Sequence, residues 1–127
     1  MTHSPGRVHT RIDGPIGWIV FDNPGKHNAM SVAMWEAMPA ALAALQSDPQ
    51  VRVVVLRGAG DQAFVSGADI SQFDQVRDTV EANQRYEAIG NTGMTAIADC
   101  SKPTIAMLQG WTLGGGVAIT LNCDLRI

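Results

Sequence analysis

The stretch Val51-Arg52-Val53-Val54-Val55-Leu56-Arg57 is a nearly continuous run of β-branched and aliphatic residues. Such a run, without polar alternation, is typical of a strand that is buried on both faces of a largely parallel sheet. Asp48-Pro49 closes the segment before it, and a glycine-punctuated loop, residues 58–67, follows it. The run therefore predicts an α/β domain in which helices pack on a sheet.

Upstream of this strand, the sequence predicts a β-hairpin followed by a helix. Residues 8–12 and 17–21 read as two strands joined by the turn Asp13-Gly14-Pro15. Ser31 can cap a helix with an apolar stripe at spacings of 4, 4 and 3. The stripe consists of Met34, Met38, Leu42 and Leu45. Pro39 lies inside this helix and removes a backbone donor, so we expect a kink or a break there.

Downstream, the order of elements continues the α/β pattern. Apolar residues and glycines at helical spacing predict a second helix; they are Tyr86, Ile89, Gly90, Gly93, Met94 and Ile97. Lys102-Pro103 opens a strand over residues 104–108, and the glycine-rich turn 110–116 leads into the apolar segment 117–121. Residues 123–127 read as the start of a further buried strand. Strand and helix alternate throughout, without a repeat, linker or low-complexity segment.

Composition places the chain among globular proteins and excludes several classes of function. Its 127 residues, 46% hydrophobic and 17% charged, suffice for one domain. A net charge of −3 leaves no broad basic surface for nucleic acid. No run is apolar enough for a signal peptide or a membrane span, so we expect a cytoplasmic protein that binds no membrane. Cys100 and Cys123 lack metal-ligand spacing, so we expect reduced thiols and no metal site.

Two loops share one design: each leaves a strand, is rich in small residues and leads into a helix. They are residues 63–70 and residues 110–116. Small side chains let a bound group approach the backbone N–H, and a helix N-terminus adds unpaired donors and the positive end of its dipole. If the loops converge, one N–H from each would point at a single oxygen, as an oxyanion hole requires. The glycine triplet 114–116 taken alone also fits tight packing of a helix on a strand.

Four blocks of sequence resemble the crotonase superfamily, the enoyl-CoA hydratase/isomerase family. They are the turn 23–30 (NPGKHNAM), the strand entry 48–56, the loop 66–70 (SGADI) and the block that runs from 102–106 (KPTIA) to 114–116 (GGG). They occur in the family's order and cover nearly the whole chain. The resemblance implies a crotonase-like spiral of ββα units that binds acyl-CoA and stabilises a thioester enolate. Residues 1–127 would be the N-terminal portion of a single such domain, apparently truncated, since a family domain continues for about as long again.

The resemblance also implies roles for particular residues. By motif position, the backbone N–H groups of Ala68 and Gly115 would form the oxyanion hole. Lys26 is placed to meet the phosphates of CoA, and an ordinary solvated lysine is an equally good interpretation. The other candidate CoA contacts are Ala29, Ser66, Gly67, Asp69, Ile70 and Gly114. CoA would arrive as part of the substrate, and no separate cofactor is expected.

Three other side chains near these motifs have alternative interpretations. Asp69 can cap the helix that follows it, which we prefer to an acid/base role. His27 reads as a surface residue in a turn, with no metal ligand near it. Phe73 and Trp111 are loop side chains on which the acyl pocket could depend.

The sequence departs from the family's hydratases at one position. These usually carry a glutamate two residues after the glycine triplet, where it helps hold and deprotonate water, and this chain has Ala118. An alanine transfers no proton, so this position argues against two-carboxylate hydration. The resemblance places the family's other acid/base residue beyond Ile127. Isomerisation, racemisation, C–C bond chemistry and thioester hydrolysis stay open.

Two rival functions remain beside the non-hydratase enzyme. One is a catalytically inactive module that binds CoA thioesters. The other is a dinucleotide-binding unit, which the absence of GxGxxG and of an acidic residue about 20 positions further on disfavours. Crotonases commonly assemble as trimers or hexamers, so the resemblance implies a homo-oligomer.

Overall fold

The computed structural model describes residues 6–69 and 79–127. The first elements along the chain are β1 (Arg7–Asp13), β2 (Ile16–Asp22), α1 (Val32–Ser47), β3 (Val53–Gly58) and β4 (Ala63–Val65). They are followed by α3 (Val80–Ala98), β5 (Thr104–Ala106), β6 (Trp111–Thr112), α4 (Gly115–Asn122) and β7 (Leu125–Arg126). Two strands precede each of these helices, so the order is the repeated ββα that the resemblance implies, and not the one-by-one alternation expected from the sequence pattern.

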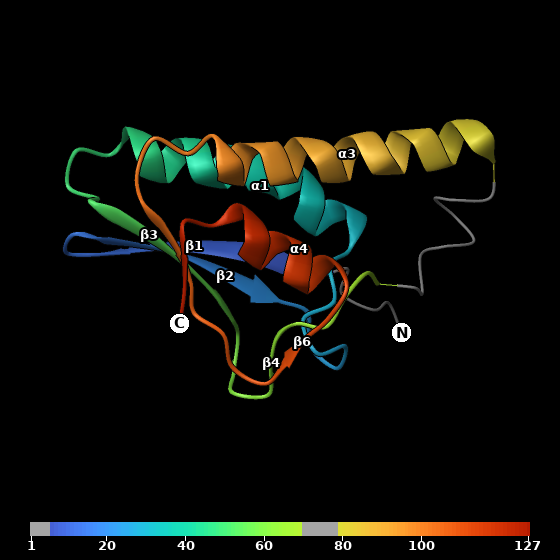
Figure 1. Cartoon of the computed structure of the whole chain (residues 1–127), viewed down its shortest axis with the longest axis horizontal. Coiled ribbons are helices and arrows are strands. Elements are labelled where there is room, and N and C mark those ends of the chain that lie inside the picture. The colour runs from blue at the N-terminus through green and yellow to red at the C-terminus, as the bar shows by residue number, and fades with distance from the viewer. Residues whose placement is uncertain (1–5, 70–78) are drawn as a thin grey trace.

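The main sheet has five strands in the order β1-β2-β3-β5-β7. Only the hairpin pair β1–β2 is antiparallel, and the pairs β2–β3, β3–β5 and β5–β7 are all parallel. A second, two-stranded parallel sheet is formed by β4 and β6, and it lies away from the main sheet (Figure 1). The predicted α/β class with a largely parallel sheet is therefore confirmed.

The central strand β3 has the environment that its sequence predicts. It pairs with β2 on one side and with β5 on the other. Val54 and Leu56 are fully buried, and Val55, which points to the opposite face, is 7% exposed. The middle of the run is thus buried on both faces, which explains why it shows no polar alternation.

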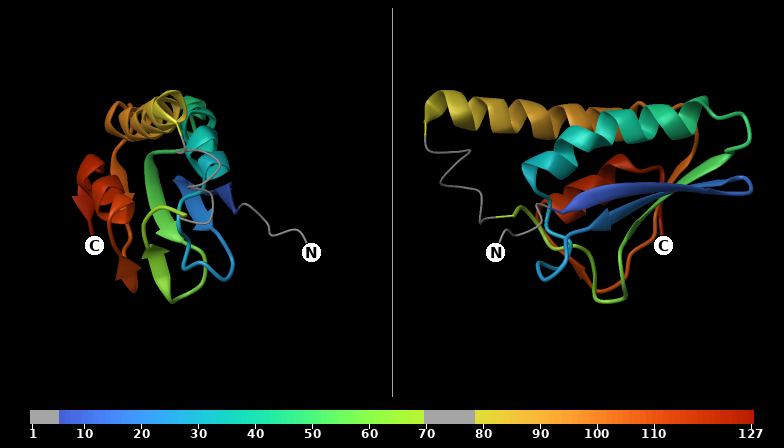
Figure 2. Two further views of the ribbon diagram at one scale, coloured as in Figure 1. Left: turned by 90° about the vertical axis from the view of Figure 1, so that its right-hand side faces the viewer. Right: turned by 180° about the vertical axis from the view of Figure 1, so that it is seen from behind.

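Helix α1 begins and packs as its sequence indicates. The Ser31 hydroxyl accepts a hydrogen bond from the Met34 N–H at 3.2 Å and caps the helix. The predicted stripe is buried: Met34, Met38, Leu42 and Leu45 are each at most 1% exposed. Pro39 does not break the helix, which runs through it, but the ribbon of α1 changes direction part-way along (Figure 2).

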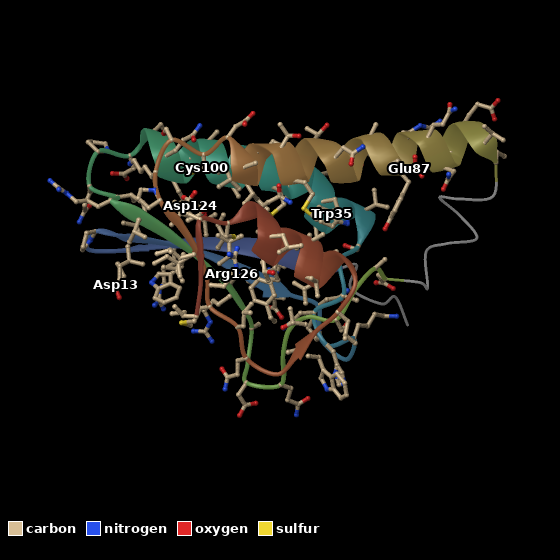
Figure 3. The ribbon with its side chains drawn as sticks, viewed as in Figure 1. Asp13, Trp35, Glu87, Cys100, Asp124 and Arg126 are labelled. Carbon is tan, nitrogen blue, oxygen red and sulfur yellow. The ribbon has the colours of Figure 1, made fainter. Side chains whose placement is uncertain are left out.

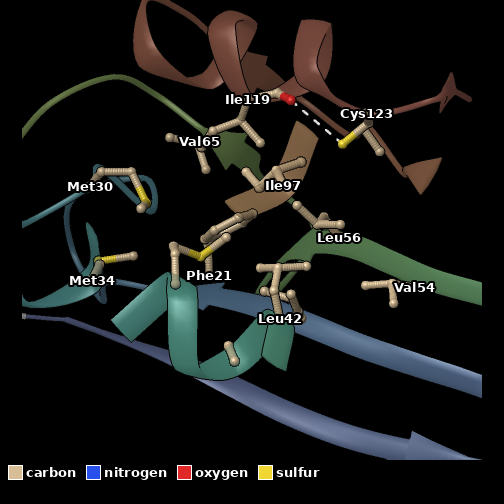
Figure 4. Packing of buried hydrophobic residues seen from close by; sticks show 14 of the residues in the cluster. Phe21, Met30, Met34, Leu42, Val54, Leu56, Val65, Ile97, Ile119 and Cys123 are labelled. Atoms are coloured by element: carbon tan, nitrogen blue, oxygen red, sulfur yellow. Dashed lines mark hydrogen bonds between the residues drawn. The ribbon is translucent and has the colours of Figure 1, made fainter. Parts of the chain in front are cut away.

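Helices α1 and α3 lie side by side above one face of the main sheet, and α4 lies below α3 (Figures 1 and 2). Gly93 permits the close approach of the first two, because a Cβ there would stand 3.0 Å from Cε3 of Trp35. The core between the layers includes Phe21, Leu56, Ile97 and residues of α4 (Figure 4).

The two cysteines are free, and Cys123 belongs to the core. Burial raises the pKa of the Cys123 thiol to about 11, so the thiol stays protonated at neutral pH. It donates a hydrogen bond to the Ile119 carbonyl at 3.5 Å. This thiol has a structural role, as expected.

Two predictions about the edges of elements were wrong. The loop predicted over residues 58–67 contains the strand β4, which is only three residues long and has no detectable periodicity. The strand predicted over residues 104–108 ends at Ala106.

The final segment also differs from its prediction, because β7 is an edge strand rather than a buried one. Leu125 is 57% exposed and Ile127 is 70% exposed. On α4, Leu121 is 68% exposed and Val117 is 41% exposed. Within the chain described, nothing covers this apolar surface. Among the described helices, none is both long and apolar enough to cross a membrane.

Gly116 should be far less tolerant of substitution than Gly90, although both lie in helices. A Cβ on Gly116 would stand 2.1 Å from the Val65 carbonyl oxygen, whereas a Cβ on Gly90 would meet nothing within 4 Å. We expect Gly116→Ala to lower the free energy of unfolding by about 2 to 3 kcal/mol. Gly90→Ala should instead raise it by up to about 1 kcal/mol. Denaturant unfolding of the two variants checks this, and equal stabilities would contradict the packing of α4 on β4.

Candidate functional site

The turn before α1 has an unusual backbone that one asparagine side chain holds in place. His27 and Asn28 both have positive φ angles, 49° and 58°, and asparagine tolerates this region better than most residues do. The side-chain oxygen Oδ1 of Asn28 accepts from the Asn23 N–H at 3.1 Å, which closes the turn on itself. Its amide donates to the carbonyls of Ala59 at 3.1 Å and Ala63 at 2.9 Å. The turn is therefore fixed to the segment that leads into β4.

A second buried asparagine connects the same turn to the loop after β4. The Asn23 amide donates to the Ala29 carbonyl at 2.7 Å and to the Asp69 carboxylate at 3.2 Å. The Lys26 ammonium lies 3.7 Å from the same carboxylate. The Asp69 side chain is 4% exposed and the Lys26 side chain is 32% exposed. Asn23 and Lys26 thus both act as partners of this buried carboxylate, and Lys26 keeps contact with solvent.

Backbone hydrogen bonds place the loop 66–69 against the turn and determine where its N–H groups point. The Met30 N–H donates to the Gly67 carbonyl at 2.8 Å, and the Asp69 N–H donates to the Met30 carbonyl at 2.9 Å. Ala68 is the bridge residue between these two bonds. In a parallel bridge the N–H of the middle residue points away from the partner strand. Within the described residues, the Ala68 N–H has no hydrogen-bond acceptor.

The second loop places Gly115 at the start of α4. The Leu113 N–H donates to the Val65 carbonyl at 3.1 Å, which ties this loop to the end of β4. Gly114 is the N-cap residue, with φ 51°, and Gly115 is the first residue of the helix. The first N–H groups of a helix have no partner within the helix. In the described part of the chain, the Gly115 N–H is bonded to no acceptor.

The two loops converge. A Cβ on Gly114 would stand 3.8 Å from the Gly67 Cα, and a Cβ on Gly67 would stand 3.8 Å from the Leu113 carbonyl oxygen. Ala68 and Gly115 line one pocket of about 410 Å³. Its other lining residues are Trp35, Tyr86, Glu87, Gly90, Asn91 and Met94. Figure 3 marks Trp35 of α1 and Glu87 of α3, two of the helical residues at this pocket. The two residues predicted to supply the N–H donors thus line the same pocket.

The remaining candidate CoA contacts lie around the same two loops. The Ser66 hydroxyl donates to the Lys26 carbonyl at 3.1 Å, and its N–H donates to the His27 carbonyl at 3.2 Å. Ala29 is 7% exposed. Ile70 lies outside the described residues.

The other predicted roles have mixed outcomes. The residues that directly follow Asp69 lie outside the described ranges, so its predicted role as a helix cap stays a prediction. Helix α3, further along the chain, is capped by the hydroxyl of Thr79, which accepts from the Ala82 N–H. Trp111 is 56% exposed and does not line the pocket of Ala68 and Gly115; its ring centroid lies 6.5 Å from that of His27, which is exposed as expected. Phe73 lies outside the described residues. Over the described ranges, no three His, Cys, Asp or Glu side chains form a group that could hold a metal.

Sequence reasoning missed the wall that α3 contributes to the pocket. Glu87 and Asn91 are four residues apart, and Met94 follows at the next turn, so they share one helix face. This polar pair borders the apolar stripe, and both residues are exposed. An exposed polar pair on a helix looks like an ordinary solvated position when the partner loops are not known.

The chain belongs to the enoyl-CoA hydratase/isomerase family. The sequence profile of that family matches residues 11–127. The scaffold agrees with the match, because a crystal structure of an enoyl-CoA hydratase/carnithine racemase from Magnetospirillum magneticum superposes with a TM-score of 0.90 at 32% identity. That superposition covers 94% of this chain and 45% of the other.

Curated relatives with similar sequences are named for different activities. A short-chain-enoyl-CoA hydratase from Clostridium acetobutylicum is 32% identical over 115 residues, which cover 91% of this chain and 43% of the relative. A peroxisomal Delta(3,5)-Delta(2,4)-dienoyl-CoA isomerase from Arabidopsis thaliana is 29% identical over 130 residues, covering 94% and 46%. The chain thus spans a little under half the length of these relatives.

Loss of the Asn28 side chain should destabilise the protein strongly. Asn28→Ala leaves a buried N–H of Asn23 and the carbonyls of Ala59 and Ala63 without a partner, so we expect a loss of about 3 kcal/mol in the free energy of unfolding. Asn28→Gly removes the same hydrogen bonds but adopts positive φ freely, so it should lose about 1 kcal/mol less. Chemical denaturation measures the free energy of unfolding of both variants. A loss below about 0.5 kcal/mol, the size typical of surface substitutions, would show that the Asn28 side chain does not hold the turn in place.

Proposed function

We propose that the native protein is an acyl-CoA enzyme that stabilises a thioester enolate with the backbone N–H groups of Ala68 and Gly115. The observation that carries the proposal is that these residues, from two different loops, line one pocket. In the described residues neither N–H has another acceptor. Preorganised donors of this kind stabilise charge that develops on an oxygen, and each contributes about 3 to 4 kcal/mol to the transition state.

The proposed chemistry is isomerase-like or another non-hydratase reaction. Relatives with the same scaffold carry the names of a hydratase and an isomerase, so the scaffold does not select the reaction. Position 118 argues against the hydratase, because Ala118 does not line the pocket and has no group to activate water. To move a double bond along an acyl chain through a thioester enolate, an enzyme needs only one proton-transfer group.

The CoA moiety is proposed to lie along the loop 66–70, with its phosphates near Lys26. Support comes from the partly exposed ammonium of Lys26, which the Asp69 carboxylate holds beside this loop. Gly67 and Gly114 present backbone without side chains at the point where the loops meet. The thioester carbonyl would then reach the donors, and the acyl group would extend toward α3. Ser66, Ala29 and Ile70 complete the proposed path.

A catalytically inactive module that binds CoA thioesters is the second candidate. Ala118 favours it, since the pocket keeps its donors while a family carboxylate is missing. Assembly as a trimer or hexamer is also proposed, on the resemblance alone. The cytoplasmic location stays a prediction from the sequence.

Replacing Gly115 by proline in the native protein should abolish thioester-directed activity. Proline removes the N–H, and the first helical position accepts its fixed φ. A Cβ there would stand 3.7 Å from Cζ2 of Trp35, which is an ordinary contact. We expect turnover to fall at least about 100-fold, with CoA-thioester affinity nearly unchanged.

Gly115→Ala is the matched control, because it adds the same Cβ but keeps the N–H. It should retain turnover within a few-fold of the wild type. A folded proline variant with unchanged turnover would refute the assigned donor.

Hydration of trans-2-enoyl-CoA by the native protein should be slow. Without a carboxylate at position 118, the attacking water lacks one of the two groups that position and deprotonate it. Spectrophotometric loss of the enoyl-thioester absorbance measures the rate. Turnover at an ordinary enzymatic value, on the order of 10 per second, would overturn the non-hydratase assignment.

A further inference from the structure

The pocket that contains the two proposed donors also contains one carboxylate. Of the described residues that line it, only Glu87 carries a carboxylate, a group that can accept a proton from carbon and return it. The donors come from the loops, Trp35 comes from α1, and Glu87 stands on α3. The carboxylate and the N–H groups therefore belong to different elements that meet at the same cavity.

Helical geometry explains why Glu87 belongs to the pocket wall. Glu87, Asn91 and Met94 occur at spacings of four and three, so they share one face of α3. Gly90 lies on the same face, and a Cβ there would meet nothing within 4 Å. The glycine thus leaves open space beside the carboxylate, into which an acyl chain can extend.

Glu87 is not committed to another strong interaction in the described part of the structure. Its Oε1 atom lies 3.5 Å from the amide nitrogen of Asn83, one turn earlier on α3, at the outer limit of a hydrogen bond. The side chain is exposed. Glu36, by contrast, lines a separate groove between α1 and α3 with Pro39 and Arg85.

We propose that Glu87 is the acid/base residue that exchanges a proton with the acyl chain, a role that Ala118 cannot fill. The proposal rests on the proposed function, because it requires a thioester oxygen at the N–H groups of Ala68 and Gly115. The Glu87 carboxylate removes a proton from the carbon next to the thioester, and the C–H electron pair moves into the enolate. The resulting carboxylic acid then returns the proton to the same carbon or, in an unsaturated chain, to the carbon two positions away.

No oxidant, reductant or further reactant enters this sequence. One C–H bond breaks and one forms, and the negative charge rests on the thioester oxygen in between. The substrate class is an acyl-CoA, saturated for simple exchange or with a double bond near the thioester for isomerisation. The acyl chain would lie along the face of α3 that carries Gly90.

Exchange of substrate hydrogen for deuterium tests the role without knowledge of the natural substrate. Butyryl-CoA is incubated with the native protein in D₂O, and deuterium at the carbon next to the thioester is followed by mass spectrometry. We expect exchange by the wild type and a loss of roughly 100-fold or more in Glu87→Gln, the usual contribution of a general base. Glu87→Gln should bind butyryl-CoA with unchanged affinity by calorimetry.

Glu81→Gln is the matched control, since Glu81 lies in the first turn of the same helix and does not line the pocket. It should exchange deuterium at the wild-type rate.

Exchange by Glu87→Gln at the wild-type rate overturns the role of Glu87 and leaves the proposed function standing. Binding without any exchange by the wild type overturns both and favours the inactive module. Glu87→Asp should recover part of the lost rate, because it keeps a carboxylate at this position. Exchange by Glu87→Asp no faster than by Glu87→Gln would contradict the acid/base role.

Discussion

The packing of α4 on β4 is the contact on which the arrangement of the site depends. Gly116 approaches the Val65 carbonyl so closely that a Cβ would stand 2.1 Å from its oxygen. The Leu113 N–H donates to that same carbonyl at 3.1 Å, so the loop before α4 is tied to the end of β4. These two contacts bring the start of α4 beside the loop 66–69. A larger residue at 116 would move the first N–H groups of the helix away from Ala68.

A second constraint acts from the other side of the first loop. Asn23 and Asn28 are buried, and both donate hydrogen bonds to backbone carbonyls of neighbouring segments. Buried amides are costly without partners, and with them they hold a segment in one conformation. The turn 23–30 therefore acts as a rigid support, against which the backbone of Gly67 and Asp69 forms a parallel bridge. The direction of the Ala68 N–H follows from that bridge.

The proposed chemistry divides between two kinds of element. The donors are backbone groups at a strand end and at a helix start, and their positions depend on glycines and hydrogen bonds rather than on functional side chains. The proposed proton-transfer group is a side chain on α3, a helix whose pocket-facing positions can change without disturbing the β4–β6 pair. A scaffold of this kind can keep one way of stabilising an enolate while the reaction changes. The hydratase and the isomerase among the relatives agree with that division.

The sequence by itself determined the elements with strong local patterns, and the family. The unalternating run of β3, the apolar stripe and Ser31 cap of α1, and the hairpin turn all depend on residues close together in the chain. The motifs also pointed to Ala68 and Gly115 as a pair. Only the tertiary structure decided that β4 and β6 are strands, because they are three and two residues long and exist through pairing with each other. It alone brought Glu87 to the pocket, since an exposed helical glutamate carries no local sign of what lies opposite. Contacts between distant segments depend on packing of the whole chain, and local spacing does not encode them.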